Sequence, residues 1–332
     1  MPPEPRVSVV VSNFNGAKYL PKLLETLAAQ RGVQTEIIVV DRRSTDESAA
    51  ILAAAPHVIV VDEPPESGLV TGYAVGAERA TADLLFFCNE DMWFEPDCLR
   101  LLAERIDLKQ RIAAADPWQW TYDGEHLIHA GTRFRRSRLN LNTPYPWRAN
   151  DFEVPLVAGS EVPFGCAGAV MVHRKVYEEV GGWDRGFFLD HEDVDLFIRT
   201  WQRGWKCVLV PDAKVYHAVN VSNVKRINGG KQLVGRRRYI SGRASQIILG
   251  VKHFTFPGML LPILVWKGLL LRHALTLSGT KLWWTLLAGK EALRRWPAAW
   301  RHRRDRIAGK LPPAERFYQA PEFQTGEHPV AS

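Results

Sequence analysis

Residues 7–12 read VSVVVS, a short apolar run rich in β-branched residues that predicts a buried β-strand. Similar runs recur at residues 36–41 (EIIVVD), 57–62 (HVIVVD) and 83–88 (DLLFFC). Between them lie segments with apolar residues at helical spacing, as in residues 19–27. Strands that are apolar on both faces and alternate with helices predict an α/β fold with a doubly wound, mostly parallel sheet.

Polar residues follow three of these strands directly. In a parallel sheet such positions meet at the carboxyl edge, where ligands bind. A polar loop or a helix cap explains any one cluster, whereas three clusters on one edge predict a binding site. Because acids repel a phosphate group unless a divalent cation lies between them, the composition indicates Mg²⁺ or Mn²⁺ with a phosphate ligand. The candidates are Asn13 in NFNG, Asp41 and Asp46 in DRRSTDES, and Asn89, Glu90 and Asp91 in NEDMWFEP.

Two common nucleotide-binding patterns are absent from the sequence. No G-x-G-x-x-G follows the first strand, and no G-x-x-x-x-G-K-[ST] occurs anywhere. Dinucleotide binding and P-loop nucleotide binding therefore lose their usual support. The segment GLVTGYAVG at residues 68–76 carries three glycines but follows no strand directly, so its signal is weak.

Four acids stand together in FFLDHEDVDLFIRTWQRGW, residues 187–205, just before an apolar pattern of helical spacing. Asp190 is expected to be the N-cap of this helix, and carboxylates in the first turn suit the positive end of the helix dipole. Capping explains only one or two of the acids. We therefore expect Glu192 and Asp193 to face a site, while the role of Asp195 stays open.

Five blocks of the sequence occur in the order found in family 2 glycosyltransferases. They read VSVVVSNFNG, VVDRRSTDES, LLFFCNEDMWFEP, GAVMVHRKVYEEVGGWDRGFF and HEDVDLFIRTWQRGWKCVLVPDAKVYHAVN. The chain most resembles the bacterial rhamnosyltransferase-type members over roughly residues 6–220, and the last two blocks are long and specific. This resemblance implies the GT-A fold, a divalent cation, a nucleotide-diphosphate sugar as donor, and inversion of the anomeric centre.

The resemblance implies roles for residues of the donor site. Asp41 would read the base of the nucleotide, and Asp46 would lie close to the nucleoside. Asn13 and Glu90 would line the same site.

The resemblance also implies a metal site. Asp91 matches the second Asp of the family's D-x-D element, and Asn89 stands where the first Asp often stands, as a neutral and weaker ligand. His217 in VYHAV matches a histidine that joins the metal in some relatives, although a lone histidine is more often structural. Glu66 and Tyr73 stand where relatives often have asparagine, which predicts altered donor recognition.

Asp193 matches the catalytic base of the family. Inverting transfer requires an acceptor hydroxyl to lose its proton as it attacks, and one carboxylate within hydrogen-bond reach suffices. Glu192, Trp183 and Gly168 are expected on the acceptor side, with Trp183 as a stacking wall for the acceptor sugar. A buried core aromatic is a comparable interpretation of Trp183, and a simple turn is a comparable interpretation of Gly168.

Charge is distributed unevenly along the chain. The formal net charge is +7, yet residues 225–310 alone carry 19 Lys and Arg against two acids, which leaves the remainder acidic. Residues 254–266, FTFPGMLLPILVW, form an uncharged run of 13 residues, whereas a spanning helix needs about 20. The Leu and Trp residues that then interleave with Lys and Arg favour amphipathic helices on an anionic membrane surface. Helices packed on the catalytic domain with a solvated basic face are one alternative. Nucleic-acid binding is another, but no nucleic-acid partner is expected, because the acidic front half gives it no obvious use.

These patterns predict three parts of the chain. Residues 1–222 are expected to form a GT-A catalytic domain, with a nucleotide-sugar part at about 1–115 and an acceptor part at about 116–222. Residues 223–310 are expected to form a basic, membrane-associating helical region, followed by an extended or disordered tail at 311–332.

The four cysteines are scattered without a C-x-x-C pair, and the N-terminus lacks the features of a signal peptide. Both observations favour a cytoplasmic protein, here at the inner face of the cell membrane. The predicted function is inverting sugar transfer from a dTDP- or UDP-sugar to a lipid-linked or polysaccharide acceptor in cell-surface glycan synthesis. The resemblance favours L-rhamnose as the sugar. The alternative is a non-catalytic protein that binds sugar nucleotides or glycans on the same fold.

Overall fold

The computed structural model describes residues 4–64, 67–136, 147–149, 157–218, 235–305 and 311–323. Over these residues the main sheet is ten-stranded, with the order β10-β12-β6-β11-β4-β1-β2-β3, and β5 adds to β12 and β7 to β6. The strands of this sheet are β1 (Arg6–Asn13), β2 (Gln34–Asp41), β3 (Val58–Asp62), β4 (Leu84–Asn89), β5 (Met92–Phe94), β6 (Ile112–Thr121), β7 (Leu127–His129), β10 (Glu161–Val162), β11 (Ala169–His173) and β12 (Lys206–His217). A separate two-stranded sheet pairs β8 (Phe134–Arg136) with β9 (Trp147–Ala149).

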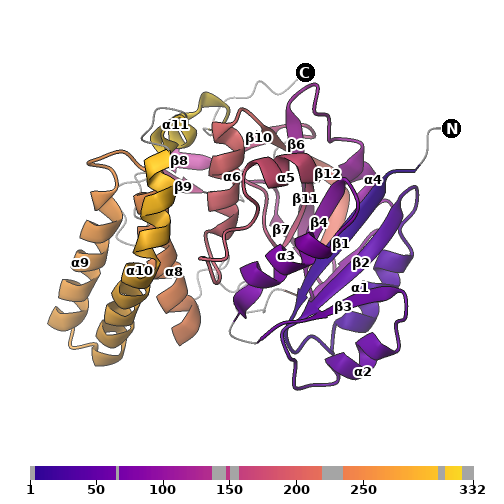
Figure 1. Ribbon diagram of the computed structural model, residues 1–332, viewed down its shortest axis with the longest axis horizontal. Helices are drawn as coiled ribbons and strands as arrows, with labels where there is room; N and C mark the ends of the chain where they lie inside the picture. Colours follow the sequence, from indigo (N-terminus) through magenta and orange to yellow (C-terminus); the bar gives the residue numbers. More distant parts are fainter. Residues whose placement is uncertain are drawn as a thin grey trace.

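Helices cover the sheet and extend beyond it (Figure 1). In chain order they are α1 (Leu20–Ala28), α2 (Ser48–Ala53), α3 (Gly68–Arg79), α4 (Cys98–Ala103), α5 (Arg174–Glu179), α6 (Glu192–Gln202), α8 (Arg236–His253), α9 (Leu260–Leu275), α10 (Gly279–Asp305), α11 (Ala314–Gln319) and the 3₁₀ helix η3 (Pro321–Phe323).

The prediction of a mostly parallel sheet is confirmed. β1 pairs in parallel with both β2 and β4, and β2 pairs in parallel with β3. β11 runs antiparallel between β4 and β6, whereas β6 and β12 are parallel again. The four strands expected from the sequence begin and end within two residues of their predicted limits.

Two apolar cores cover the two faces of β1. Val9 and Val11 point into the core beneath α1, while Val10 between them points into the core that contains Tyr73 of α3. Because both faces are buried, the strand is apolar without alternation. Gly76 lets α3 come close to the sheet, since a Cβ atom there would lie 2.3 Å from Val10 Cγ1. The glycines of α3 are therefore explained by packing.

Helices α8, α9 and α10 form a layer beside α6, on the side of the molecule away from β3 (Figure 1). Ile248 of α8 and Ala292 of α10 are buried in the same core as Leu196 of α6. This region is therefore packed on the rest of the chain, as the first alternative above expected. Among the described residues, no helix has both the length and the apolar character needed to cross a membrane.

The expectation of an extended or disordered tail is wrong for residues 311–323. They form α11 and η3, in which Phe317, Tyr318 and Phe323 are buried. Phe134 packs on this segment, with its ring centroid 4.5 Å from that of Tyr318 and 5.3 Å from that of Phe317. The polar and proline-rich composition of residues 311–332 gave no sign that these aromatic side chains would be buried. Residues 324–332 lie outside the described residues.

A buried charge cluster joins α6 to α8. The Asp195 carboxylate is fully buried and accepts hydrogen bonds from Arg199 one turn later, at 2.7 and 3.0 Å. From α8, Lys252 Nζ lies 2.5 Å and His253 Nε2 lies 2.7 Å from Asp195 Oδ1. Burial alone would raise the pKa of Asp195, but the cations of Arg199 and Lys252 and the His253 hydrogen bond hold that pKa well below its usual range. Asp195, whose role the sequence left open, is therefore a structural anion.

His253 makes the folded state sensitive to acid. Burial lowers the pKa of His253 to about 4, against the bond to Asp195, which raises it. An exposed histidine in the unfolded chain has a pKa near 6.5, so the unfolded state takes up the proton first as the pH falls. We expect the free energy of unfolding to drop by about 3 kcal/mol from this residue between roughly pH 6.5 and 4. Urea denaturation at pH 7, 6, 5 and 4 measures that drop.

His253→Gln, which keeps a donor but does not titrate, should flatten this pH dependence. The matched control is His57→Gln, because His57 is exposed. Equal pH dependence in the wild type and in His253→Gln would contradict the assignment.

Candidate functional site

The ends of β1, β2 and β4 lie side by side, as expected for a parallel sheet. Asn13 pairs in register with Asp41, and Ser12 pairs with Asn89. The Asn13 side-chain nitrogen donates to Asp41 Oδ1 at 2.6 Å, and both residues are buried. The Oδ1 atom of Asn13 is buried and has no hydrogen-bond partner in the part of the chain that the structure describes. Three of the predicted residues therefore meet at one edge.

Ser44 organises the loop after β2, a role that sequence reasoning missed. Its hydroxyl donates to Asp41 Oδ1 at 2.6 Å and its backbone N–H donates to Asp41 Oδ2 at 3.0 Å. The same hydroxyl oxygen lies 2.9 Å from the backbone N–H of Asn15, so the loops after β1 and β2 are joined. The only signal in the sequence was a serine three residues after the strand-ending Asp41, the spacing of a local turn.

Asp46 also joins the loops that follow β1 and β2. Its carboxylate accepts hydrogen bonds from the backbone N–H groups of Ala17 and Ser48, both at 3.0 Å. Burial of Asp46 opposes ionisation slightly, but the hydrogen bonds from Ser48 and Ala17 outweigh it and lower the pKa. Asp46 therefore shapes the loops beside Asp41.

Asp91 and His217 come together across the sheet, because β5 pairs with the end of β12. Asp91 Oδ1 lies 3.1 Å from His217 Nε2, and the other ring nitrogen of His217 lies 3.3 Å from Gln119 Oε1. A carboxylate oxygen and an imidazole nitrogen are both ligands that a divalent cation accepts. Within the described residues, no group of three or more His, Cys, Asp and Glu side chains is arranged to hold a metal. A cation bound by this pair would therefore need further ligands from water or from a bound substrate.

Asn89 and Tyr73, two departures from the family pattern, contact each other. The Tyr73 hydroxyl donates to Asn89 Oδ1 at 2.7 Å and also lies 3.0 Å from the carbonyl oxygen of Ala167. The Asn89 side-chain nitrogen lies 3.4 Å from His217 Nε2. Tyr73 thus engages the amide oxygen of Asn89, while the amide nitrogen faces the Asp91–His217 pair. Glu66, the third departure, lies outside the described residues.

Glu90 lies between the loop after β1 and the end of β4. Burial, together with the neighbouring Asp91 charge, raises the pKa of Glu90 to about 7, although the Arg42 cation lowers it. Gly16 packs on the Glu90 side chain, since a Cβ atom at Gly16 would lie 2.8 Å from Glu90 Cγ and 2.2 Å from Asn13 Oδ1. The close approach of the loop to these two side chains therefore requires a glycine at position 16.

The expectation that Asp190 caps α6 is wrong. The helix begins at Glu192, and Asp190 and His191 both have left-handed backbone angles, with φ of 67° and 72°. The Asp190 carboxylate instead accepts hydrogen bonds from the Arg238 guanidinium of α8 at 3.0 and 3.3 Å. Asp190 therefore makes a contact with Arg238, 48 positions away in the sequence, in place of the expected helix cap.

Glu192 and Asp193 differ in burial at the first turn of α6. Glu192 is buried, and burial together with the Asp193 charge raises its pKa well above the usual range. Asp193 is only half-buried, and its Oδ1 accepts the Val194 backbone N–H at 2.7 Å. The helix dipole stabilises a negative charge at this position. Asp193 is therefore better placed than Glu192 to act as a carboxylate.

Residues 165–168 lie beside the end of β4. The carbonyl of Gly168 accepts the Asn89 backbone N–H at 2.9 Å. A Cβ atom at Gly168 would lie 3.0 Å from Met92 Cε, so this position favours the smallest residue. Burial raises the pKa of the Cys166 thiol, and the Asp193 charge raises it further. The turn is therefore bonded to the end of β4.

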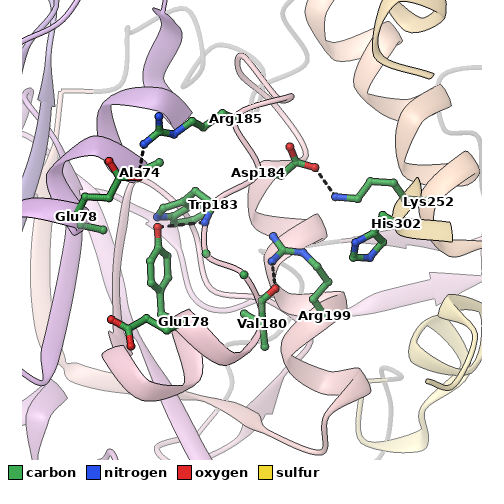
Figure 2. Close-up of a pocket in the computed structure, with 14 residues that line it drawn as sticks. Ala74, Glu78, Glu178, Val180, Trp183, Asp184, Arg185, Arg199, Lys252 and His302 are labelled. Atoms are coloured by element: carbon green, nitrogen blue, oxygen red, sulfur yellow. Dashed lines mark hydrogen bonds and ion pairs between the residues drawn. The ribbon is translucent and has the colours of Figure 1, made fainter. Parts of the chain in front are cut away.

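Trp183 does not have the open face that a sugar-stacking residue needs. Only 3% of Trp183 is exposed, and its ring centroid lies 5.3 Å from that of Phe87 and 5.6 Å from that of Tyr73. The core interpretation of Trp183 therefore fits the structure. Trp183 lines a cavity of about 560 Å³. Figure 2 shows that Lys252 and Asp184, which also line it, are bonded to each other. None of the polar strand-end residues lines this cavity.

Comparisons with known proteins agree with the resemblance seen in the sequence. The family model described as Glycosyl transferase family 2 matches residues 8–181, more than half of the chain. An uncharacterized protein of Mycobacterium tuberculosis is 26% identical over 250 residues, which cover 72% of this chain and 75% of that protein. The N-acetylglucosaminyl-diphospho-decaprenol L-rhamnosyltransferase of the same organism is 24% identical over 234 residues, which cover 63% of this chain and 75% of that enzyme.

Solved structures support the fold. The crystal structure of GalNAc-T7 with UDP, GalNAc and Mn²⁺ superimposes with a TM-score of 0.53 at 21% identity, covering 64% of this chain and 43% of that one. The mannosyltransferase PcManGT from Pyrobaculum calidifontis, in complex with GDP-Man and Mn²⁺, gives a TM-score of 0.50 at 15% identity and covers 96% of this chain and 84% of that one. With the mostly parallel sheet described above, these similarities confirm the predicted GT-A fold.

Gly16→Ala tests the close packing of the two strand ends. The added methyl group would overlap Asn13 Oδ1 and Glu90 Cγ, and forcing extra volume into a packed site costs about 1–3 kcal/mol. We expect urea denaturation to show a free energy of unfolding that is lower by this amount. Ligand binding at the ends of β1 and β4 should also be weaker. The matched control is Gly279→Ala at the start of α10, where no atom lies within 4 Å of the new methyl group. An unchanged Gly16→Ala variant would contradict the described packing.

Proposed function

The chain belongs to glycosyl transferase family 2, and from this premise we propose that it transfers a sugar, with inversion, from a nucleotide-diphosphate sugar to a lipid-linked or polysaccharide acceptor. The product would be part of a cell-surface glycan. The observation that carries the proposal is the Asp91–His217 pair, which lies next to Asn89 on the sheet edge that also bears the bonded pair Asn13 and Asp41. A donor with a base at one end and a diphosphate at the other needs both features at one site.

Asp41 would recognise the base of the donor. An ionised carboxylate offers about four lone-pair positions, and Asn13 and Ser44 use three of them in the described structure. One acceptor position therefore stays available for a ring N–H, which both uracil and thymine carry. This supports a UDP- or dTDP-sugar as donor.

Asp91 and His217 would hold a divalent cation, Mg²⁺ or Mn²⁺. Support comes from the contact between these side chains and from the Mn²⁺ present with nucleotide or nucleotide sugar in the GalNAc-T7 and PcManGT structures. A bound cation would neutralise the charge that develops on the departing diphosphate. Because the described residues offer two such ligands at this place, a bound cation would need further ligands from the donor or from water, and metal and donor would bind together.

Asp193 would act as the general base. An acceptor hydroxyl attacks the anomeric carbon, the bond from that carbon to the diphosphate oxygen breaks, and the hydroxyl proton passes to the Asp193 carboxylate. Burial and the Asp193 charge raise the pKa of Glu192 beside it, so ionisation is disfavoured at Glu192 rather than at the half-buried Asp193. The sugar would be L-rhamnose, an assignment supported by the 24% identity to the mycobacterial rhamnosyltransferase.

Asp193→Asn should lower transfer by about 10²–10⁴-fold while donor affinity stays within about twofold, because a general base acts only in the chemical step. The assay follows nucleoside-diphosphate release from a panel of dTDP-, UDP- and GDP-sugars with Mn²⁺ or Mg²⁺ and a membrane-lipid extract, and calorimetry measures donor binding. Asp190→Asn serves as the control, since Asp190 is paired with Arg238. Equal loss of transfer and of donor binding in Asp193→Asn would make that residue structural. If the wild-type protein neither released nucleoside diphosphate from any donor nor bound one, that result would favour the glycan-binding form of the non-catalytic alternative.

The exposed sides of α9 and α10 support association with the inner face of the cell membrane. Leu264, Leu271 and Leu275 fall on one face of α9 and are 60–74% exposed, and Leu277 in the turn to α10 is 92% exposed. Exposed cations lie among them, at Lys267, Arg272 and Lys281. Bulky apolar side chains interspersed with positive charge suit the interface of an anionic bilayer.

Leu271→Glu combined with Leu275→Glu should lower the affinity of the protein for phosphatidylglycerol vesicles at least tenfold, as measured by sedimentation. Two exposed leucines would then become charged without any change in the core. Val60→Glu is the control, because Val60 is exposed on the edge strand β3. Vesicle binding that survives the double change would exclude this surface as the membrane contact.

A further inference from the structure

A second cavity, of about 510 Å³, lies between residues 185–188 and the helices α8 and α10. Within the described part of the chain, its wall is strongly basic and contains a single acid. The charged residues that line it are Arg185, Arg237, Lys290, Arg294, Arg295 and Glu291. Its volume falls in the range of pockets that bind small molecules.

The cations of this cavity are only partly neutralised. Glu291 alone serves both Arg294 and Arg295, each at 2.8 Å. Arg185 pairs with Glu78 outside the cavity, as Figure 2 shows. Lys290 has no ion pair within the described ranges of the chain. Positive charge therefore remains in excess along the α10 side of the cavity.

Arg237 adds to this excess. Its guanidinium lies 4.0 Å over the ring of Phe188, and it has no carboxylate partner among the residues that the structure describes. Ser67, at the start of α3, also lines the cavity. Further along the same helix, the Tyr73 hydroxyl donates to Asn89 Oδ1. Helix α3 therefore joins the cavity to the edge where the donor would bind.

The cavity also adjoins the segment that carries Asp193. The Ser241 hydroxyl, in the wall of the cavity, donates to the carbonyl of Leu189 at 3.0 Å. Arg238 on the same helix binds Asp190. A ligand in the cavity would thus lie beside the loop that leads into α6.

Two exposed leucines of α10 lie close to Lys290, which lines the cavity. Leu286 and Leu293 stand four residues before and three residues after Lys290, which puts all three on one helix face. Leu286 is 44% and Leu293 is 69% exposed. A molecule that joins a phosphate group to a hydrocarbon chain would find a partner for each part here.

We propose that this cavity binds the diphosphate of a lipid-linked acceptor, with the adjoining hydrocarbon chain along the exposed face of α10. This inference rests on the proposed function and deepens it by naming the acceptor class. Arg and Lys side chains bind phosphate oxygens by charge-assisted hydrogen bonds, and Arg does so in bidentate fashion. With the diphosphate held between Arg237 and Lys290, the sugar attached to it would extend toward Asp193.

Farnesyl diphosphate is the probe for this site, with farnesol as its uncharged counterpart. Calorimetry on the full chain in the presence of EDTA keeps the donor metal site out of the measurement. We expect the wild type to bind farnesyl diphosphate but not farnesol. Lys290→Gln combined with Arg294→Gln should weaken binding at least tenfold.

The matched control is Arg301→Gln combined with Arg304→Gln. These two arginines are also exposed on α10, lie outside the cavity, and their loss changes the net charge equally. The control should bind the probe within twofold of the wild type. Equal weakening in both double variants, or no binding by the wild type, would overturn the proposal.

Vesicles of phosphatidylglycerol distinguish the acceptor diphosphate from an ordinary lipid headgroup. We expect the two double variants to lose vesicle affinity to the same extent, because both remove two surface cations. Selective loss of vesicle binding by the Lys290–Arg294 variant, with unchanged farnesyl diphosphate binding, would make the cavity a headgroup site and overturn the assignment. None of these measurements requires a donor or Asp193. Failure here would therefore leave the proposed transfer reaction standing.

Discussion

Asp195 holds an ionised carboxylate in the core, and groups from two helices surround it. Arg199 comes from the same helix, whereas Lys252 and His253 come from α8. Removing one partner of such a buried pair costs about 3–5 kcal/mol, because the remaining charge loses its compensation. The cluster therefore fixes α8 against α6. The first turn of α6 carries Asp193, so the proposed base is positioned by a charge two residues further along the same helix.

The parallel sheet supplies the second constraint. Strands β1, β2 and β4 must end at one edge, and their last residues are polar. Asn13 of β1 bonds to Asp41 of β2, whereas Asn89 of β4 accepts a bond from Tyr73. The β5–β12 pairing adds His217 to that edge, and the carbonyl of Gly168 bonds to the backbone of Asn89 there. Donor, metal and acceptor functions can thus be assigned to separate elements that share one rim. The basic cavity lies between residues 185–188 and the C-terminal helices α8 and α10.

The sequence predicted what depends on burial and strand order. Residues 7–12 could be recognised because both faces of β1 are covered, and Asn13, Asp41 and Asn89 could be grouped because parallel strands end together. Features that depend on distant side chains were missed or wrong. Asp190 was predicted to cap α6 because its actual partner, Arg238, is 48 residues away in the sequence. Residues 311–323 were predicted to be extended because the distant residue on which their aromatic side chains pack, Phe134, could not be identified from local composition. The hydroxyl of Ser44 and the size of Gly16 matter only once the loops after β1 and β2 meet.

The most direct test of the account is the position of Mn²⁺ in crystals grown with a nucleotide-diphosphate sugar, located by anomalous scattering. The account predicts a single peak within ligand distance of the Asp91 and His217 side chains, bridged to the diphosphate, with the base beside Asp41. A donor bound with its base away from Asp41, or a manganese peak that contacts neither Asp91 nor His217, would contradict it.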